Sequence, residues 1–122
     1  MKRVNRVTRN EDFTRIIGKK KSVSNGIFVV YYLENSLDHM RIGISVGKKI
    51  GNAVRRNKVK RQLRMMLNDL CNFNDSSDLI VIVRSTYNNQ SFIENKKDLL
   101  QVLKKVKMIE HDILIDKEYL NE

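Results

Sequence analysis

The spacing of hydrophobic residues changes from strand-like to helix-like in the middle of the chain. Residues 41–46 alternate between branched apolar side chains and small or polar ones, which predicts a strand. Between Val59 and Leu70, leucine and methionine recur at offsets of 4, 7, 8 and 11, which is the spacing of one helix face. Asn57 is predicted to cap this helix, with a looser turn from Asn52 before it. We therefore expect a strand, a glycine-containing turn and an amphipathic helix at the centre of the fold.

The second face of that strand carries mostly small side chains. After Arg41, the residues that alternate with the apolar positions are Gly43 and Ser45, and neither fills much space above the sheet. A strand face of this kind lets the backbone of a ligand approach closely. We therefore expect this face to be open.

Two segments precede the strand pattern at the N-terminus. Residues 1–9 are polar and basic, and we expect them to be loosely held. Asn10 is suited to cap a short helix that ends near Gly18, because the two acids after Asn10 favour the positive end of a helix. The apolar side of this helix consists of Phe13, Ile16 and Ile17.

Apolar residues on both faces predict two further strands. Residues 27–33 follow an Asn-Gly turn, and residues 21–24 before that turn are a candidate for a short strand. Residues 79–83 are continuously apolar, as in a strand that is buried on both faces. The polar segments 34–39 and 72–78 are predicted to be loops.

The last predicted helix begins with a capping box. Ser91 precedes Glu94 by three positions, and apolar residues at helical spacing then continue to about Met108. Residues 109–122 are rich in acids and form either one more short helix or a frayed extension. The order α-β-β-β-α-β-α predicts an α+β fold, a small single-sheet sandwich, as one domain with its core at about residues 5–108. The predicted core face of the last helix is Leu99, Leu100, Leu103 and Val106.

The charge of the chain narrows the classes of partner. Its 24 Lys and Arg residues exceed its 14 Asp and Glu residues by ten, and the net charge of +10 favours a nucleic acid or an anionic membrane surface. No apolar run approaches the roughly 18 residues that span a bilayer, and no signal-peptide core follows the N-terminus. A single cysteine, Cys71, excludes an internal disulfide. Together these features predict a cytoplasmic protein without a membrane segment.

Much of the positive charge gathers in one interval. Between Asp38 and Asp69 there is no acidic residue, so the cations there have no partners for ion pairs along a helix. A solvated cationic face on an ordinary surface helix is the alternative, but such faces usually mix both signs. We therefore expect a polyanion to neutralise this stretch. The nine cations are Arg41, Lys48, Lys49, Arg55, Arg56, Lys58, Lys60, Arg61 and Arg64.

The sequence contains no catalytic constellation. His39 lies in a predicted loop and His111 near the C-terminus, and neither has an evident partner. The carboxylates are not clustered, as a metal-dependent nuclease would require. Cys71 and Met66 are expected to pack in the core, whereas Met65 points elsewhere. We therefore predict no catalytic residue, no metal ligand and no cofactor bound by the protein alone.

A longer motif within the basic interval resembles the signature of a known family. The chain reads Gly-Lys-Lys-Ile-Gly-Asn-Ala-Val over residues 47–54, then Arg55, then Arg-Asn-Lys-Val-Lys-Arg over residues 56–61. This motif resembles that of the bacterial ribonuclease P protein component, and the resemblance covers roughly residues 5–106. The family typically has an arginine at the position of Lys58. The lysine keeps the charge but lacks the planar fork that binds two oxygens at once.

The resemblance implies a function and a detail of the fold. In that family the RNA subunit carries the active site and its magnesium ions, and the reaction removes the 5′ leader from precursor tRNA. The protein subunit binds the ribonuclease P RNA and precursor tRNA, and no small-molecule substrate is involved. The implied fold is similar to the second domain of ribosomal protein S5, with a left-handed β-α-β crossover.

The resemblance also assigns residues to two surfaces. A cleft between the first helix and the sheet would hold the single-stranded leader, with Phe13 and Tyr31 at aromatic positions where bases can stack. Ile17 stands where the family has a second aromatic residue, and the alternative for Phe13 is a plain core anchor. The residues implied to bind the catalytic RNA are Lys48, Lys49, Asn52, Arg55, Arg56, Asn57, Lys58, Lys60, Arg61 and Arg64.

Two other functions compete with this interpretation. A ribosome-associated or general RNA-binding module without a processing role would have the same charge and type of fold. A stand-alone nuclease would cut RNA without any RNA subunit. Only the specific motif favours the ribonuclease P protein over the general RNA-binding module.

Overall fold

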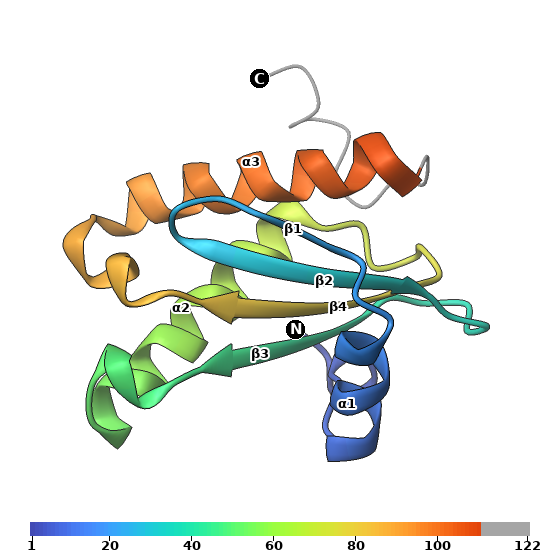
Figure 1. Ribbon diagram of the computed structural model, residues 1–122, viewed down its shortest axis with the longest axis horizontal. Helices are drawn as coiled ribbons and strands as arrows, with labels where there is room; N and C mark the ends of the chain where they lie inside the picture. Colours follow the sequence, from blue (N-terminus) through green and yellow to red (C-terminus); the bar gives the residue numbers. More distant parts are fainter. Residues whose placement is uncertain (111–122) are drawn as a thin grey trace.

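Four strands form one mixed sheet in the computed structural model, which describes the backbone of residues 1–110 and the side chains of residues 1–106 (Figure 1). The strand order is β1-β2-β4-β3, with β2 antiparallel to both neighbours and β3 parallel to β4 at the edge. The strands are β1 (Ser22–Ser24), β2 (Phe28–Glu34), β3 (Arg41–Val46) and β4 (Ser77–Val83). The helices are α1 (Asn10–Gly18), α2 (Ala53–Leu70) and α3 (Phe92–Glu110), with 3-10 turns at Arg3–Asn5, Lys48–Ile50 and Ser85–Asn89.

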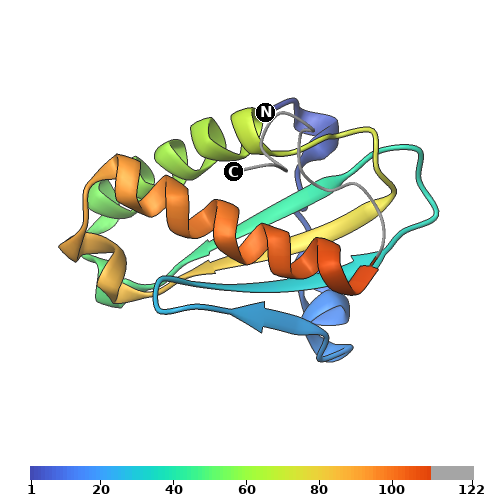
Figure 2. The same cartoon turned by 90° about the horizontal axis from the view of Figure 1, so that it is seen from above.

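The helices lie on both faces of the sheet. α2 and α3 cover one face, and α1 crosses the other (Figures 1 and 2). The main core lies beneath α2 and α3 and joins Phe28 of β2 to Leu63 of α2 and Leu99 of α3, all fully buried. A smaller cluster beneath α1 joins Ile16 to Ile80 of β4. The predicted α+β single-sheet fold and its element order are confirmed.

The strand, turn and basic helix at the centre of the sequence form a parallel crossover. β3 pairs with β4 from Arg41 opposite Asp78 to Val46 opposite Val83, and α2 connects the two strands. The predicted strand–turn–helix unit is therefore confirmed. The left-handed sense of the crossover stays a prediction.

Helix α2 begins earlier than its apolar pattern. Its N-cap is Asn52, whose Oδ1 accepts a hydrogen bond from the backbone N–H of Arg55 at 3.0 Å. Gly51 turns the chain into this cap with a φ of 149°, which favours glycine. The prediction that Asn57 caps the helix is wrong. In the first turn Val54 is 78% exposed, so this turn does not pack on the core. The apolar spacing in the sequence therefore does not reveal where the helix begins.

The N-terminal segment pairs with the free edge of the sheet. The side-chain amide of Asn5 is buried and donates a hydrogen bond to the Met40 carbonyl at 2.7 Å. The backbone N–H of Val7 donates to the Ile42 carbonyl at 3.0 Å, and Arg6 forms a parallel bridge with Ile42. The expectation that residues 1–9 are loosely held is therefore wrong. The Asn5 side chain and the Val7 backbone donate hydrogen bonds to carbonyl groups at the edge of β3 and just before it. This edge exists only in the folded protein.

The C-terminal half follows the predictions with one shift. β4 begins at Ser77, inside the predicted loop, because Ser77 and Asp78 pair with β2 and are buried. The capping box is confirmed: Ser91 Oγ accepts the Glu94 N–H at 3.2 Å, and Glu94 Oε1 accepts the Ser91 N–H at 3.2 Å. The four predicted core residues of α3 are all buried. Residues 111–122, with His111 and most of the predicted acidic extension, lie outside the described residues.

The sulfur-containing residues of α2 and its end lie where the pattern placed them. Met66 is fully buried in the main core, and Met65 is 56% exposed. Cys71 is buried at the end of the helix, and this burial raises the pKa of its thiol to about 12. The thiolate is therefore scarce near neutral pH, and the prediction of a packing role for Cys71 is confirmed.

Candidate nucleic-acid interface

Five of the six cations of α2 lie on two neighbouring sides of the helix. Lys58 and Arg61 are exposed, whereas Arg56, Lys60 and Arg64 follow one another at intervals of four and are half-buried. We call these last three residues the cation row. Within residues 1–106, none of these five cations forms an ion pair. The Nε atom of Arg56 is buried and has no hydrogen-bond partner in that part of the chain. Five positive charges therefore remain for an external anion.

The start of α2 is fastened to the turn before α3. The Arg55 guanidinium donates to Asn88 Oδ1 from Nη2 at 2.7 Å and from Nε at 3.1 Å. Asn88 in turn donates to the Ile50 carbonyl at 2.8 Å. Because Asn88 is neutral, Arg55 keeps its charge but loses mobility. Of the other predicted amide residues, Asn52 is the helix cap and Asn57 is exposed.

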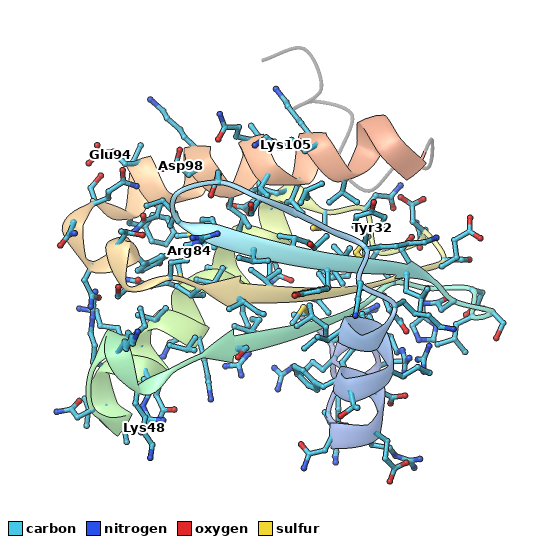
Figure 3. All side chains as sticks on the ribbon, viewed as in Figure 1. Tyr32, Lys48, Arg84, Glu94, Asp98 and Lys105 are labelled. Atoms are coloured by element: carbon cyan, nitrogen blue, oxygen red, sulfur yellow. The ribbon has the colours of Figure 1, made fainter. Side chains whose placement is uncertain are left out.

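A second basic region lies at the carboxyl ends of β3 and β4. Lys48 and Lys49 are exposed on the 3-10 turn that follows β3, and they line a recess of about 530 Å³ with Arg84. Lys48 and Arg84 lie toward the same end of the sheet (Figure 3). Arg84 is not among the residues that the sequence predicts for either surface. The sequence feature that could have indicated Arg84 is its position as the cation directly after the apolar residues of β4.

The three predicted leader residues come together beneath α1. Phe13 and Ile17 of α1 and Tyr31 of β2 are half-buried around Ile80, and we call these four residues with Ile16 the α1 cluster. Phe13 and Tyr31 thus pack against one apolar cluster, and their role in binding a leader stays a prediction. Each keeps part of its surface accessible.

Phe13 covers the strand face that was expected to be open. A Cβ atom on Gly43 would lie 2.6 Å from Phe13 Cζ and 2.7 Å from Ile80 Cδ1, so the ring rests directly on the glycine. The expectation of an open face is therefore wrong at Gly43, which is buried, while Ser45 farther along β3 is half-exposed. Gly43 accommodates an aromatic side chain of the protein itself.

The α1 cluster and the cation row meet at one recess. A recess of about 180 Å³ at the edge of β3 is lined by Phe13 of α1, Ile44 of β3, and Lys60 and Arg64 of α2. Arg6 of the N-terminal segment also lines it. The sequence suggested two separate surfaces, but an aromatic ring and unpaired cations share this recess. Such a combination suits single-stranded nucleic acid, because bases stack on rings while phosphates contact cations.

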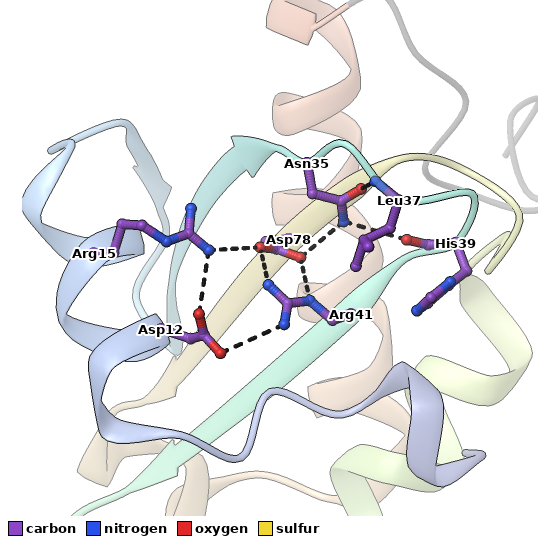
Figure 4. A network of polar contacts seen from close by, with 7 residues as sticks. All are labelled: Asp12, Arg15, Asn35, Leu37, His39, Arg41 and Asp78. Carbon is purple, nitrogen blue, oxygen red and sulfur yellow. Dashed lines mark hydrogen bonds and ion pairs between the residues drawn. The ribbon is translucent and has the colours of Figure 1, made fainter.

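One of the nine cations is neutralised within the protein. Arg41 donates to Asp78 Oδ1 from Nε at 3.0 Å and to Asp78 Oδ2 from Nη2 at 2.7 Å (Figure 4). Asn35 donates to the same carboxylate at 2.8 Å and Arg15 at 3.3 Å. Burial raises the pKa of Asp78, but hydrogen bonds from Arg41 and Asn35 outweigh it, so this pKa lies below its ordinary value. The inclusion of Arg41 among the unpaired cations is wrong.

The described residues offer no metal-binding or membrane-spanning element. His39, expected to have no partner, places Nδ1 2.9 Å from Asp38 Oδ1, and this contact lowers the pKa of Asp38. Within residues 1–106, no group of three or more His, Cys, Asp or Glu side chains could hold a metal ion. No helix in the same range is long and apolar enough to cross a membrane.

Comparisons with known proteins point to one family. A model of the ribonuclease P protein family matches residues 1–107. The ribonuclease P protein component of Streptococcus pyogenes is 44% identical over 110 residues, which cover 90% of this chain and 92% of that protein. The component of Streptococcus mutans is 41% identical over 118 residues, covering 97% and 99% of the two chains.

Two solved structures agree with the sequence relatives. The RNase P protein of Staphylococcus aureus superposes with a TM-score of 0.76 at 41% sequence identity, and the match covers 84% of this chain and 95% of that one. The RNase P protein of Thermotoga maritima superposes with a TM-score of 0.72 at 34% identity, covering 82% and 96% of the two chains. The family match, the identities and the shared fold agree, and the chain belongs to the ribonuclease P protein component family.

Proposed function

We propose that this chain is the protein subunit of a cytoplasmic ribonuclease P, which removes the 5′ leader of precursor tRNA by endonucleolytic cleavage. The protein binds the catalytic RNA and the leader, and the RNA subunit carries the active site. The observation that carries this proposal is the set of unpaired cations on α2, which borders the α1 cluster at a shared recess in a member of this family. A general RNA-binding module needs the cations but not this junction.

The cations of α2 are proposed to dock the protein on the catalytic RNA. Arg61 is exposed and can bind two phosphate oxygens through its planar guanidinium. Lys58 beside it acts as a point charge and binds without the same directional preference. Arg55 is held by Asn88 and presents its charge at a fixed place. Lys48, Lys49, Asn52, Asn57 and the cation row complete the proposed docking surface.

The α1 cluster is proposed to bind the single-stranded leader. Phe13 and Tyr31 offer partly accessible rings on which bases can stack, and Ile17 adds an apolar edge in place of a second ring. The shared recess then brings phosphates of the same strand near Lys60 and Arg64. The leader and the catalytic RNA would thus occupy adjoining surfaces of one small protein.

Magnesium is proposed to belong to the RNA subunit. Among the residues whose side chains the structure describes, no clustered carboxylates could hold this ion. The contribution of the protein is to bind and orient RNA. Such docking raises the local concentration of phosphates around the RNA active site and positions the leader.

Reconstitution with the catalytic RNA is expected to reveal activity that neither part shows alone. At low magnesium concentration, the assembled enzyme should cleave precursor tRNA at the mature 5′ end, since the protein cations offset the repulsion between the two RNAs. The protein alone should cleave nothing, because no described residue set can activate water. Gel analysis of labelled precursor tRNA measures both.

The alternatives give different results in that assay. A general RNA-binding module would leave cleavage by the RNA subunit unchanged at low magnesium. A stand-alone nuclease would cut precursor tRNA after all RNA had been removed from the preparation. Either outcome would remove the proposed function.

Tyr31→Ala is expected to weaken precursor tRNA binding by the assembled enzyme by roughly 1–3 kcal/mol, the value of one base stacked on an aromatic ring. Mature tRNA has no leader and should bind as before. Equilibrium binding of both tRNA forms measures the difference. Tyr31→Phe is the matched control, because it keeps the ring and should retain leader binding. Equal losses for both tRNA forms would mean that Tyr31 is only a core residue.

A further inference from the structure

Helix α1 depends on the sheet for its position. It has only nine residues, and a helix of this length is not stable in isolation. Its apolar contact is small: Ile16 is its single fully buried residue and meets Ile80 and Val7. Phe13 and Ile17 are only half-buried in the same cluster. Apolar packing alone therefore does not fix the position and orientation of α1 on the sheet firmly.

Two polar links tie α1 to the sheet beside these apolar contacts. Asp12 Oδ2 lies 3.5 Å from Arg41 Nη1, and Arg15 Nη2 lies 3.3 Å from Asp78 Oδ2 (Figure 4). Asp12 and Arg15 also contact each other at 3.5 Å. Asp78 is fully buried and accepts two short hydrogen bonds from Arg41 of the neighbouring strand β3. The acceptor of Arg15 is therefore a fixed point of the sheet.

Each link lies next to a residue of the proposed leader site. Asp12 directly precedes Phe13, whose ring must sit on Gly43 within the narrow space that the glycine leaves. Arg15 is two residues before Ile17 and lies on the side of α1 that meets Asp78. A small rotation or shift of α1 would break both links and lift the ring from Gly43.

We propose that Asp12 and Arg15 are positioning residues for leader binding: through Arg41 and Asp78 they seat α1 so that Phe13 and Ile17 face the leader path. The inference rests on the proposed leader-binding role of the α1 cluster. Neither residue needs to touch RNA. They increase the fraction of molecules in which the α1 cluster is ready to bind, and apparent affinity falls in proportion when that fraction falls.

The double variant Asp12→Asn/Arg15→Gln tests this inference. It removes one negative and one positive charge, so the net charge of +10 and the general attraction to RNA stay the same. It also leaves the buried Asp78–Arg41 pair intact. We expect the assembled enzyme to bind precursor tRNA about threefold to tenfold more weakly and mature tRNA equally well. In the free protein, amide hydrogen exchange in α1 should become faster relative to α3.

A matched control is available on the other face of the sheet. Asp69 of α2 and Lys96 of α3 form an ion pair at 2.9 Å, and Asp69→Asn/Lys96→Gln removes it with the same neutral change of charge. This control should leave the ratio of precursor to mature tRNA affinity unchanged. If the α1 double variant does not fold, Arg15→Gln alone is compared with Lys96→Gln, which loses the same single charge.

Three outcomes separate the inference from the function on which it rests. An unchanged affinity ratio in the folded α1 variant, with a loss in Tyr31→Ala, would overturn the positioning role and leave the proposed function standing. Equal weakening for precursor and mature tRNA would show a merely structural role and would also overturn it. If Tyr31→Ala and the α1 variant both leave the ratio unchanged, the leader role of the α1 cluster itself fails.

Discussion

Asp78→Ala is expected to lower the free energy of unfolding by about 3–5 kcal/mol, the usual cost of breaking a buried ion pair by removing one partner. The variant deprives the Arg41 guanidinium of hydrogen bonds at 2.7 and 3.0 Å and leaves it only the 3.5 Å contact to Asp12. The Arg41 side chain is only 20% exposed, so water does not fully replace the lost hydrogen bonds. Denaturant-induced unfolding followed by circular dichroism measures the change.

Asp38→Ala is the control for that variant. Asp38 is fully exposed, and its one ion pair among the described residues is with His39, so its removal should change stability little. A loss of stability in Asp78→Ala no larger than in Asp38→Ala would contradict the structural importance of the buried pair.

The stability due to Asp78 is also expected to depend on pH. The pKa of Asp78 in the folded protein lies below its ordinary value of 3.8. A group with a lowered pKa stabilises the folded state above the unfolded value, and this stability is lost as the pH falls through the folded pKa. The difference between the wild type and Asp78→Ala should therefore be full at pH 7 and shrink below a pH of about 4. A difference that stayed constant on acidification would contradict a role for the charge.

Arg56→Ala/Arg61→Ala is expected to weaken binding of the catalytic RNA by at least about a hundredfold at moderate salt, since hydrogen bonds from charged groups contribute about 1.5–3 kcal/mol each. Both arginines lack an ion-pair partner among the residues whose side chains are described. Each phosphate contact releases counterions, so the slope of log affinity against log salt should flatten by about 0.7–0.9 per lost contact. Filter binding over a range of salt concentrations measures both quantities.

Lys97→Ala/Lys105→Ala is the charge-matched control. Both lysines belong to α3 and not to the proposed docking surface, and Lys105 Nζ donates a hydrogen bond to the Ser24 carbonyl at 2.8 Å. This variant loses the same two charges, so it separates direct phosphate contact from the effect of net charge. Equal slopes for the two double variants would show that the arginines on α2 act only through overall charge.

The basic surface could be predicted because helix periodicity and charge are local properties. The offsets of apolar residues after Val59 assign one side of α2 to the core, and the remaining sides must carry the cations. The half-buried state of the cation row could not be predicted. Lys60 and Arg64 of this row share a recess with Arg6 and Val7 of the N-terminal segment, which lies far from α2 in the sequence.

The α1 cluster could be predicted only in part. The resemblance to the family placed Phe13 and Tyr31 together, and the fold brings them into one cluster. The alternation of small residues along β3 predicted an open face at Gly43, because a strand pattern does not show what packs on it. In the folded protein, Phe13 occupies that space.

The sequence by itself determined the fold class, the basic helix and the core residues, since hydrophobic spacing and charge density act over neighbouring positions. Only the tertiary structure decided which charges are free. Arg41 and Asp78 are 37 residues apart, and they meet because β3 and β4 are parallel neighbours with these residues opposite each other. No pattern within either strand encodes that register. The same pairing builds the anchor for α1, so the seating of the proposed leader site is a product of the folded sheet.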